Sequence, residues 1–223
     1  MLILTADSLS KIATLIKGDR ADKITKLINS VCPIYGIDTP DIFHEFISNV
    51  LHESAEFTRL EEGLNYQAIA LTKVFGRHRI SIDDCYRYGR TMKQKANTRA
   101  IANLIYGGSW GRTNLGNTLI GDGWDFRGSG PIQNTGRSNI TKFTNYYNTK
   151  FGGKHTPEAM AILLRTDLNI GIHSACWFFA IAKNLIQLSI DDKMTEVVKR
   201  INGGVIGMKE RLHYLKLAEK YIV

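Results

Sequence analysis

Residues 39–53 have the sequence TPDIFHEFISNVLHE, which has the pattern of an amphipathic helix with a marked start. Thr39 can cap the first turn, Pro40 suits the first helical position, and the Asp41 carboxylate complements the helix dipole. Apolar residues then recur at offsets of three and four, up to Val50 and Leu51. Glu53 continues this apolar stripe. The segment therefore predicts a helix that carries a carboxylate on its apolar face.

A helical period extends over most of the remaining chain. Further helices are predicted over residues 21–31, 67–75, 81–88, 94–106, 138–147, 167–183, 191–201 and 207–221, with another start at residues 156–158. Residues 107–136 are rich in glycine, so we expect no helix there and at most a short hairpin. The predicted fold class is mainly α, with little or no β. We expect one domain over residues 1–223, without a separate binding module.

Cysteine usage and hydropathy exclude several classes of protein. Cys32, Cys85 and Cys176 fit neither a disulfide framework nor a zinc pattern, so we expect three buried thiols and no metal site. The first residues lack the basic start and the apolar run of a signal peptide. No apolar run is long enough to span a bilayer. We therefore expect a chain that is made in the cytoplasm and has no transmembrane segment.

The charge balance favours an anionic partner. Lys and Arg number 29 against 21 Asp and Glu, which gives a net charge of +8. Part of this excess lies between residues 77 and 99, at Arg77, Arg79, Arg87, Arg90, Lys93, Lys95 and Arg99. A solvated surface is the simplest interpretation of this basic patch. The patch lacks the interleaved aromatic residues that stack bases, so we expect an anionic cell-wall surface, rather than nucleic acid, as its partner.

Glu53 is the first candidate for chemistry. A carboxyl group on an apolar helix face is partly desolvated, and desolvation favours its neutral form. A carboxyl group that stays protonated near neutral pH can act as a general acid toward a glycosidic oxygen. Glu53 could equally be a solvated residue at a fraying helix end. A second acid follows at Glu61 or Glu62, and two carboxylates that flank a sugar bond define the usual arrangement of a glycosidase. Spacing alone does not choose between these two residues.

Five segments in order resemble glycoside hydrolase family 19, which contains chitinases and phage lysozyme-like endolysins. They are FISNVLHES (46–54), LEEGLNY (60–66), IANLIYGG (101–108), GDGWDFRGSGPIQNTGR (121–137) and NGG (202–204). The resemblance covers roughly residues 37–215, and such a set of segments is more specific than one short motif. It implies a lysozyme-like helical domain with two lobes around a substrate cleft.

The resemblance also implies roles for individual residues. Glu53 would be the general acid, Glu62 the general base, and Thr135 would position the attacking water. The resemblance implies sugar or water contacts for Gln133, Asn139 and Asn202, and sugar faces could stack on Tyr66, Tyr106 and Trp124, although ordinary packing explains at least half of such aromatics. No cofactor is implied. The family inverts stereochemistry, so the two carboxyl groups would lie about 6.5–9.5 Å apart in the competent state.

Departures from the family pattern refine the expected activity. Ser129 stands where the family usually has an arginine able to pair with an acid, which bears on the role of Glu62. The disulfides of plant chitinases are missing, which favours the endolysin branch. We therefore expect a monomeric endolysin that hydrolyses β-1,4 bonds in the glycan strand of bacterial peptidoglycan, after release through a holin or similar lesion. The alternatives are a chitinase, a lytic transglycosylase, and an inactive wall-binding or tail module.

Overall fold

The computed structural model describes residues 3–222, so Met1 and Leu2 of the N-terminal segment and Val223 lie outside the described residues. Within that range the chain forms fourteen α-helices, a short 3-10 helix and a π-helical segment, and its only β structure is three isolated bridges. The prediction of a mainly α fold with little or no β is confirmed. None of the helices in the described part of the chain combines the length and apolarity needed to cross a membrane.

The chain divides into two compact units. Unit 1 comprises the chain up to Leu60, the short segment Gly130–Gln133 and the chain from Thr166 onward. Unit 2 comprises Glu61–Ser129 and Asn134–Arg165. Each unit has its own core of apolar side chains, and each is described by itself below.

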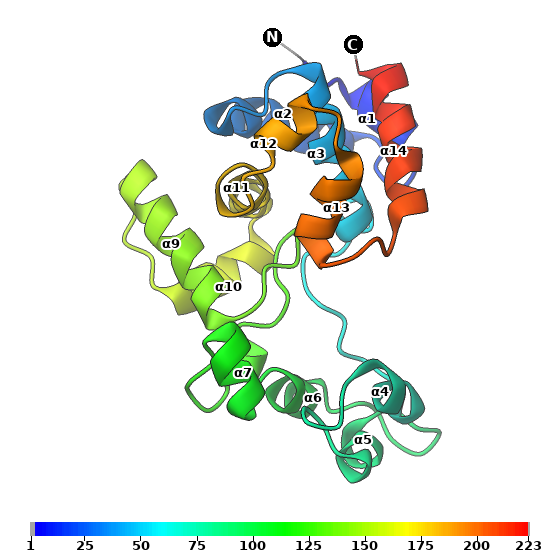
Figure 1. Ribbon diagram of the computed structural model, residues 1–223, viewed down its shortest axis with the longest axis vertical. Helices are drawn as coiled ribbons and strands as arrows, with labels where there is room; N and C mark the ends of the chain where they lie inside the picture. Colours follow the sequence, from blue (N-terminus) through cyan, green and yellow to red (C-terminus); the bar gives the residue numbers. More distant parts are fainter. Residues whose placement is uncertain (1–2, 223) are drawn as a thin grey trace. The chain divides into compact units, whose positions relative to one another are not determined.

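Unit 1 is organised around one buried helix. Its α-helices are α1 (Ala6–Ile12), α2 (Asp19–Val31), α3 (Pro40–Glu53), α11 (Leu168–Trp177), α12 (Ile186–Ile190), α13 (Met194–Asn202) and α14 (Met208–Tyr221). The 3-10 helix (Cys32–Tyr35) follows α2, and the π-helical segment (Phe178–Ala182) continues α11. The long helix α14 packs along α3, and α12 also contacts α3 (Figure 1). Helix α3 is therefore covered by other helices of its own unit.

Helix α3 begins where the sequence predicts but differs from the prediction in two ways. Thr39 occupies the N-cap position in an extended conformation, yet its side chain makes no capping hydrogen bond. All ten residues from Ile42 to Leu51 are buried, including the polar Glu45, Ser48 and Asn49. The helix is thus a buried one rather than an amphipathic one, because neighbouring helices cover its polar positions as well as its apolar stripe.

Unit 2 consists of shorter helices. They are α4 (Ala68–Val74), α5 (Ile82–Tyr88), α6 (Thr98–Ile105), α7 (Gly108–Leu115), α8 (Asp122–Asp125), α9 (Arg137–Phe151) and α10 (Pro157–Thr166), of which α10 leaves the unit at its last residue. One core cluster joins α4, α5 and α6 and contains Leu64, Leu71, Phe75, Ile80, Cys85, Ile101, Ala102 and Ile105. Ser81, the first residue of the helix predicted over residues 81–88, caps α5, because its hydroxyl accepts the Asp84 N–H at 3.0 Å.

The expectation that residues 107–136 contain no helix is wrong, because α7 and α8 lie within them. A glycine in a helix costs about 1 kcal/mol relative to alanine, and that cost can be offset by packing. At Gly111 an added Cβ would lie 2.0 Å from the Tyr106 carbonyl oxygen, so only glycine allows this close approach. Gly116, with a φ of 68°, then ends α7 in the left-handed conformation. Gly111 therefore allows the close packing of α7, and Gly116 allows the helix to end.

Other element boundaries also differ from the prediction. Helix α6 starts at Thr98 rather than residue 94, because the Asn97 side chain accepts the Ala100 N–H and caps it. The apolar segment 167–183 is an α-helix only to Trp177 and then continues as a π-helix. The helix expected over residues 191–201 is α13, which begins at Met194 and ends at Asn202, whereas α1 and α12 lie where the sequence analysis predicts no separate helix.

The three cysteines are buried and free, as predicted. Cys32 and Cys176 face each other with their sulfur atoms 3.7 Å apart. Burial raises the pKa of the Cys176 thiol, and the neighbouring Cys32 adds to that shift. The Cys176 thiol therefore stays neutral, and both buried side chains act as packing groups.

Candidate active site

Glu53 is the last residue of α3, and a buried arginine from α14 holds its side chain. Arg211 Nη2 donates a hydrogen bond to Glu53 Oε1 in an ion pair, and the Arg211 side chain is fully buried. Arg211 Nη1 donates to the Oδ1 atom of Asn49, one helical turn earlier on α3. The Glu53 side chain keeps 21% of its surface exposed. One guanidinium group therefore fixes the position of a carboxylate that solvent can still reach.

His52, the residue before Glu53, lies near the same guanidinium group. Burial, and then the positive charge of Arg211, lower the pKa of its imidazole. An added Cβ at Gly207 would lie 2.3 Å from His52 Nε2, so the imidazole packs directly on the backbone where α14 begins. The neutral imidazole of His52 is therefore packed in place next to Glu53.

The turn that follows Glu53 is held in an unusual backbone conformation. Ala55, Glu56 and Phe57 all have positive φ values, of 46°, 58° and 58°. The buried Glu56 carboxylate accepts the Leu15 N–H at 2.6 Å and the Tyr214 hydroxyl at 2.9 Å. Left-handed residues other than glycine cost about 1 kcal/mol or more each, so this turn persists only because its surroundings hold it. These bonds therefore fix the end of α3, where Glu53 lies.

Glu62, in unit 2, is held by uncharged donors. Its Oε1 accepts the Tyr106 hydroxyl at 2.7 Å, and its Oε2 accepts the Gly128 N–H at 3.2 Å. The Glu62 N–H in turn donates to the Gly128 carbonyl at 2.9 Å. Burial, and then the negative charge of Glu62, raise the pKa of Tyr106 far above its usual value. Tyr106 therefore remains a hydrogen-bond donor to Glu62 across the physiological range of pH.

The neighbouring Glu61 has a different environment. Arg127 Nε donates to Glu61 Oε1 at 2.9 Å, and Arg127 Nη2 donates to the same oxygen. The Arg127 guanidinium also stacks on the Trp124 ring, 3.7 Å from its centroid. Arg127 therefore forms an ion pair with Glu61, whereas the hydrogen-bond donors to Glu62 within residues 3–222 are uncharged. This is the structural difference between the two candidates for the second carboxylate.

Ser129 stands where the family usually has an arginine, and the side chain of another arginine of this chain contacts it. Ser129 is fully buried, and its hydroxyl donates to the Arg127 carbonyl at 2.7 Å. Arg165 Nη1, from α10, donates to the Ser129 hydroxyl oxygen at 2.9 Å and to the Asp125 carbonyl at 3.1 Å. A guanidinium group from a distant part of the sequence therefore reaches the position where the family resemblance places an arginine.

Thr135 and Asn139 lie together in unit 2, at the start of α9. Asn139 Nδ2 donates to the Thr135 carbonyl at 2.9 Å, and Asn139 is exposed. Gln133 and Asn202 belong to unit 1. Gln133 has a φ of 51° and donates through Nε2 to the Gly130 carbonyl at 3.0 Å, and Asn202 Nδ2 donates to the Ile206 carbonyl at 3.0 Å. Each of these amides is thus oriented by a backbone carbonyl.

The three aromatic residues that could stack on sugars have different neighbours in the structure. Tyr66 packs edge-on against Phe75, and the Tyr106 hydroxyl donates a hydrogen bond to Glu62. Arg127 covers one face of Trp124.

The sequence analysis did not identify Arg211 as a residue of the site. A signal was present, since Arg211 lies on one helical stripe with the apolar Leu215 and Ala218, and a charged residue on such a stripe needs a buried partner.

Two arginines of the basic patch make contacts within unit 2. Arg77 Nη2 donates to the carbonyls of Leu71, Thr72 and Phe75. The Arg79 guanidinium stacks on Trp110, 3.8 Å from its ring centroid. Arg77 is nonetheless exposed, whereas Arg79 is half-buried, so the interpretation of the patch as a solvated surface is wrong only for Arg79. The other five basic residues of the patch are exposed as well.

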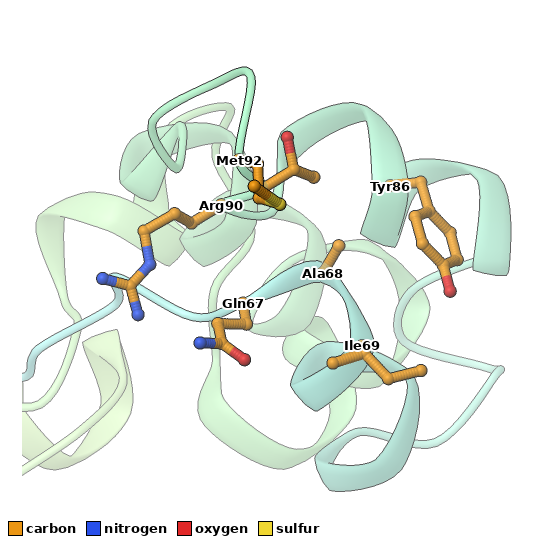
Figure 2. Close-up of a pocket in the computed structure, with 7 residues that line it drawn as sticks. Gln67, Ala68, Ile69, Tyr86, Arg90 and Met92 are labelled. Carbon is orange, nitrogen blue, oxygen red and sulfur yellow. The ribbon is translucent and has the colours of Figure 1, made fainter.

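A cavity of about 480 Å³ adjoins the exposed part of the basic patch. It is lined by Gln67, Ala68, Ile69, Tyr86, Arg90, Thr91 and Met92. Figure 2 shows the Arg90 and Gln67 side chains on one side of the cavity and Tyr86 on the other. The lining thus combines a cation, an amide and an aromatic ring, which are groups that bind polar and anionic carbohydrates.

The helical fold and these motifs are those of a glycoside hydrolase. A curated protein of Haemophilus influenzae (strain ATCC 51907 / DSM 11121 / KW20 / Rd), described as a glycosyl hydrolase family 19 domain-containing protein, is 32% identical to this chain over 166 residues. The alignment covers 74% of this chain and 72% of that protein. No protein-family model matches the chain. On this similarity, the chain belongs to glycosyl hydrolase family 19.

Proposed function

We propose that this glycoside hydrolase is an endolysin that cleaves β-1,4 bonds in the glycan strand of bacterial peptidoglycan with inversion of configuration. The observation that carries the proposal is that each of its two carboxylates is held in place by identified donors. Arg211 pairs with Glu53, and within residues 3–222 the Tyr106 hydroxyl and the Gly128 N–H donate to Glu62. The family resemblance assigns proton donation to Glu53 and proton acceptance to Glu62, and the fixed positions of both carboxylates support these roles.

In the proposed reaction Glu53 protonates the glycosidic oxygen as the bond from that oxygen to the anomeric carbon breaks. A water molecule attacks the anomeric carbon from the opposite face of the ring, and Glu62 accepts its proton. Proton exchange with solvent then restores both carboxyl groups. Arg211 stabilises the charge that develops on Glu53 as its proton leaves, so its contribution is larger in the transition state than in the ground state.

The neutral residues of the site have positioning roles in this proposal. Thr135 and Asn139, which are joined by a hydrogen bond, orient the attacking water. Gln133 and Asn202 bind sugar hydroxyls and amides, and the half-buried rings of Tyr66 and Trp124 stack on sugar faces. Amides and hydroxyls suit these tasks because they add no charge that would perturb the two carboxyl groups.

The choice of peptidoglycan over chitin rests on charge. The net charge is +8, and the exposed side of the basic patch presents Arg87, Arg90, Lys93, Lys95 and Arg99. Peptidoglycan carries carboxylates and chitin carries none, so long-range attraction favours the wall polymer. Such attraction weakens as salt shortens the Debye length from about 10 Å at 0.1 M. We therefore expect wall binding and lysis by the protein to fall as sodium chloride is added.

Digestion of purified peptidoglycan in oxygen-18 water tests both the bond and the chemistry. We expect mass spectrometry to show fragments with one heavy oxygen at a new reducing end. Proton NMR of fresh product should show the α-anomer, because inversion at a β-linkage gives α. Anhydro-sugar ends would establish a lytic transglycosylase and overturn the proposal. Faster turnover of chitohexaose than of peptidoglycan would establish a chitinase instead.

Matched variants test the two carboxylates. Glu53→Gln and Glu62→Gln should each lower kcat by about 10²-fold or more while leaving wall binding intact. Glu61→Gln is the control, since it removes a neighbouring carboxylate that Arg127 already neutralises. Equal loss in Glu61→Gln and Glu62→Gln would reject the assignment of the base. Wall binding without cleavage by the wild-type protein would instead indicate an inactive binding module.

A further inference from the structure

A cavity of about 450 Å³ in unit 1 has an acidic lining that the proposed reaction does not use. Helices α3, α12 and α14 border it. Its carboxylates are Asp41, Glu45, Asp192 and Glu219. The chain as a whole has a net charge of +8, so this cavity is a local reversal of its charge. Such a reversal attracts cations to one place on a basic protein.

Glu45 is the buried member of this set. Its side chain lines the cavity with a residue exposure of only 3%. The Oε2 atom accepts the Ser189 hydroxyl at 2.9 Å, whereas the buried Oε1 atom has no hydrogen-bond partner among residues 3–222. A buried carboxylate oxygen without a donor is costly, and a donor entering the cavity would remove that cost.

The charge state of Glu45 responds to its surroundings. Burial raises the pKa of Glu45 to about 7, and the negative charges of Asp192 and Asp41 add to the shift. His44, the other titratable group of the lining, is hydrogen-bonded through Nε2 to the Ile222 carbonyl at 2.8 Å. Near neutral pH a cation would therefore compete with a proton for Glu45.

The three remaining carboxylates lie at the rim. Asp41, Asp192 and Glu219 are exposed, and none of their side chains forms an ion pair or hydrogen bond within the described part of the chain. Lys193, next to Asp192 in the sequence, pairs with Asp191 instead, at 3.4 Å. The negative charge of the rim is thus available to a ligand from outside.

We propose that this cavity binds a primary alkylammonium group, supplied either by a free diamine or by a lysine-type side chain of a peptide. An ammonium group has three donors, enough to meet Glu45 Oε1 and a rim carboxylate together. Ile190 and Leu215, which also line the cavity, can contact an alkyl stem. The carboxylates do not converge as metal ligands do, since no three His, Cys, Asp or Glu side chains of the described chain are placed to hold a metal ion.

Isothermal titration calorimetry of the full chain tests this site. The probes are 1,5-diaminopentane for the free source, N-acetyl-lysine amide for the peptide source, and calcium chloride. We expect one saturable site for the diamine, the lysine amide or both, and the tighter of the two identifies the source. Near pH 7 binding should release protons, seen as heats that differ between buffers of different ionisation enthalpy. No saturation up to about 10 mM of either amine, or tighter binding of calcium, would overturn the proposal.

Three variants locate the binding. Glu45→Gln should weaken amine binding about tenfold or more and abolish proton release. Asp192→Asn, at the exposed rim, should weaken it by up to about fivefold, and this variant does not disturb the buried core. Glu196→Gln, an exposed carboxylate of α13 outside the cavity, is the matched control. Unchanged affinity in both cavity variants would show that the amines bind elsewhere and reject the proposed site.

Discussion

Arg211 and Glu53 are separated by 158 residues in the sequence and are joined by an ion pair in which the arginine is fully buried. The same guanidinium reaches Asn49, so it spans one turn of α3. A buried cation needs acceptors, and here both acceptors lie on the helix that ends at Glu53. The packing of α14 on α3 therefore determines where this carboxylate points.

The first prediction concerns Arg211→Lys. Lysine keeps the positive charge but cannot reach Asn49 and Glu53 together in the geometry of the guanidinium fork. We expect kcat to fall about 10- to 100-fold with KM nearly unchanged, because a misplaced acid affects the chemical step more than sugar binding. Steady-state kinetics on solubilised peptidoglycan and a thermal melt check this.

The control for this prediction is Arg200→Lys, on the exposed surface of α13, which should leave kinetics and melting temperature unchanged. A merely structural Arg211 would give a lower melting temperature with unchanged kcat per folded molecule, and that result would contradict a positioning role.

The second prediction concerns Tyr106→Phe. This change removes the hydroxyl that donates to Glu62 Oε1 at 2.7 Å and keeps the ring. A hydrogen bond to a charged group contributes about 1.5–3 kcal/mol, so we expect kcat/KM to fall about tenfold or more. Loss of a donor also favours the protonated form of the base, so the acidic limb of the pH–rate profile should move to higher pH.

Tyr88→Phe is the matched control, because Tyr88 is a half-buried tyrosine of the same unit and lies outside the proposed catalytic set. A pH–rate profile in Tyr106→Phe that superimposes on the wild type would argue that Glu62 is not the base.

The sequence predicts those features that depend on local chemistry. Pro40 starts α3, Ser81 caps α5, and Pro157 starts α10 at the predicted positions. Caps and prolines act within a few residues, so their effects can be read along the chain. Glu53 was likewise located by helical spacing and by the motif around it.

Features that depend on distant contacts could not be predicted in the same way. Gly111 permits α7 because it touches the Tyr106 backbone, and glycine content alone favoured an irregular segment. The choice between Glu61 and Glu62 depends on Arg127 and Tyr106, which lie 66 and 44 residues away in the sequence. Likewise, Arg165 lies 36 residues from the serine that it contacts. Only packing brings such pairs together.

The third prediction concerns stability and the buried Glu45. The folded state raises the pKa of Glu45 from 4.5 to about 7, so its favourable contribution is fully present below pH 4.5 and is lost as pH rises through 7. The loss amounts to at most about 3 kcal/mol. Glu45→Gln should remove this dependence, and the variant should be the more stable protein above pH 7. Urea titrations from pH 4 to 8, without amines, measure the difference, and Glu196→Gln serves as the control. A difference that does not change with pH would show that Glu45 ionises normally.

The fourth prediction compares two glycines with nearly the same backbone conformation. Gly207 and Gly203 have φ values of 76° and 75°, but a Cβ at Gly207 would meet His52 Nε2 at 2.3 Å, whereas a Cβ at Gly203 would have no neighbour within 4 Å. Alanine in the left-handed region costs about 1–2 kcal/mol, and this cost is common to both sites. We therefore expect Gly207→Ala to lower the free energy of unfolding by about 1 kcal/mol more than Gly203→Ala, because the imidazole must move.

The imidazole that Gly207→Ala displaces is adjacent to Glu53 in the sequence, so this change should also lower kcat. A double variant separates the two costs: in a His52→Ala background the contact is gone, and Gly207→Ala should then cost no more than Gly203→Ala in chemical denaturation. If the extra cost of Gly207→Ala persists in that background, the contact with His52 is not its cause, and the packing of α14 against the end of α3 must depend on other atoms.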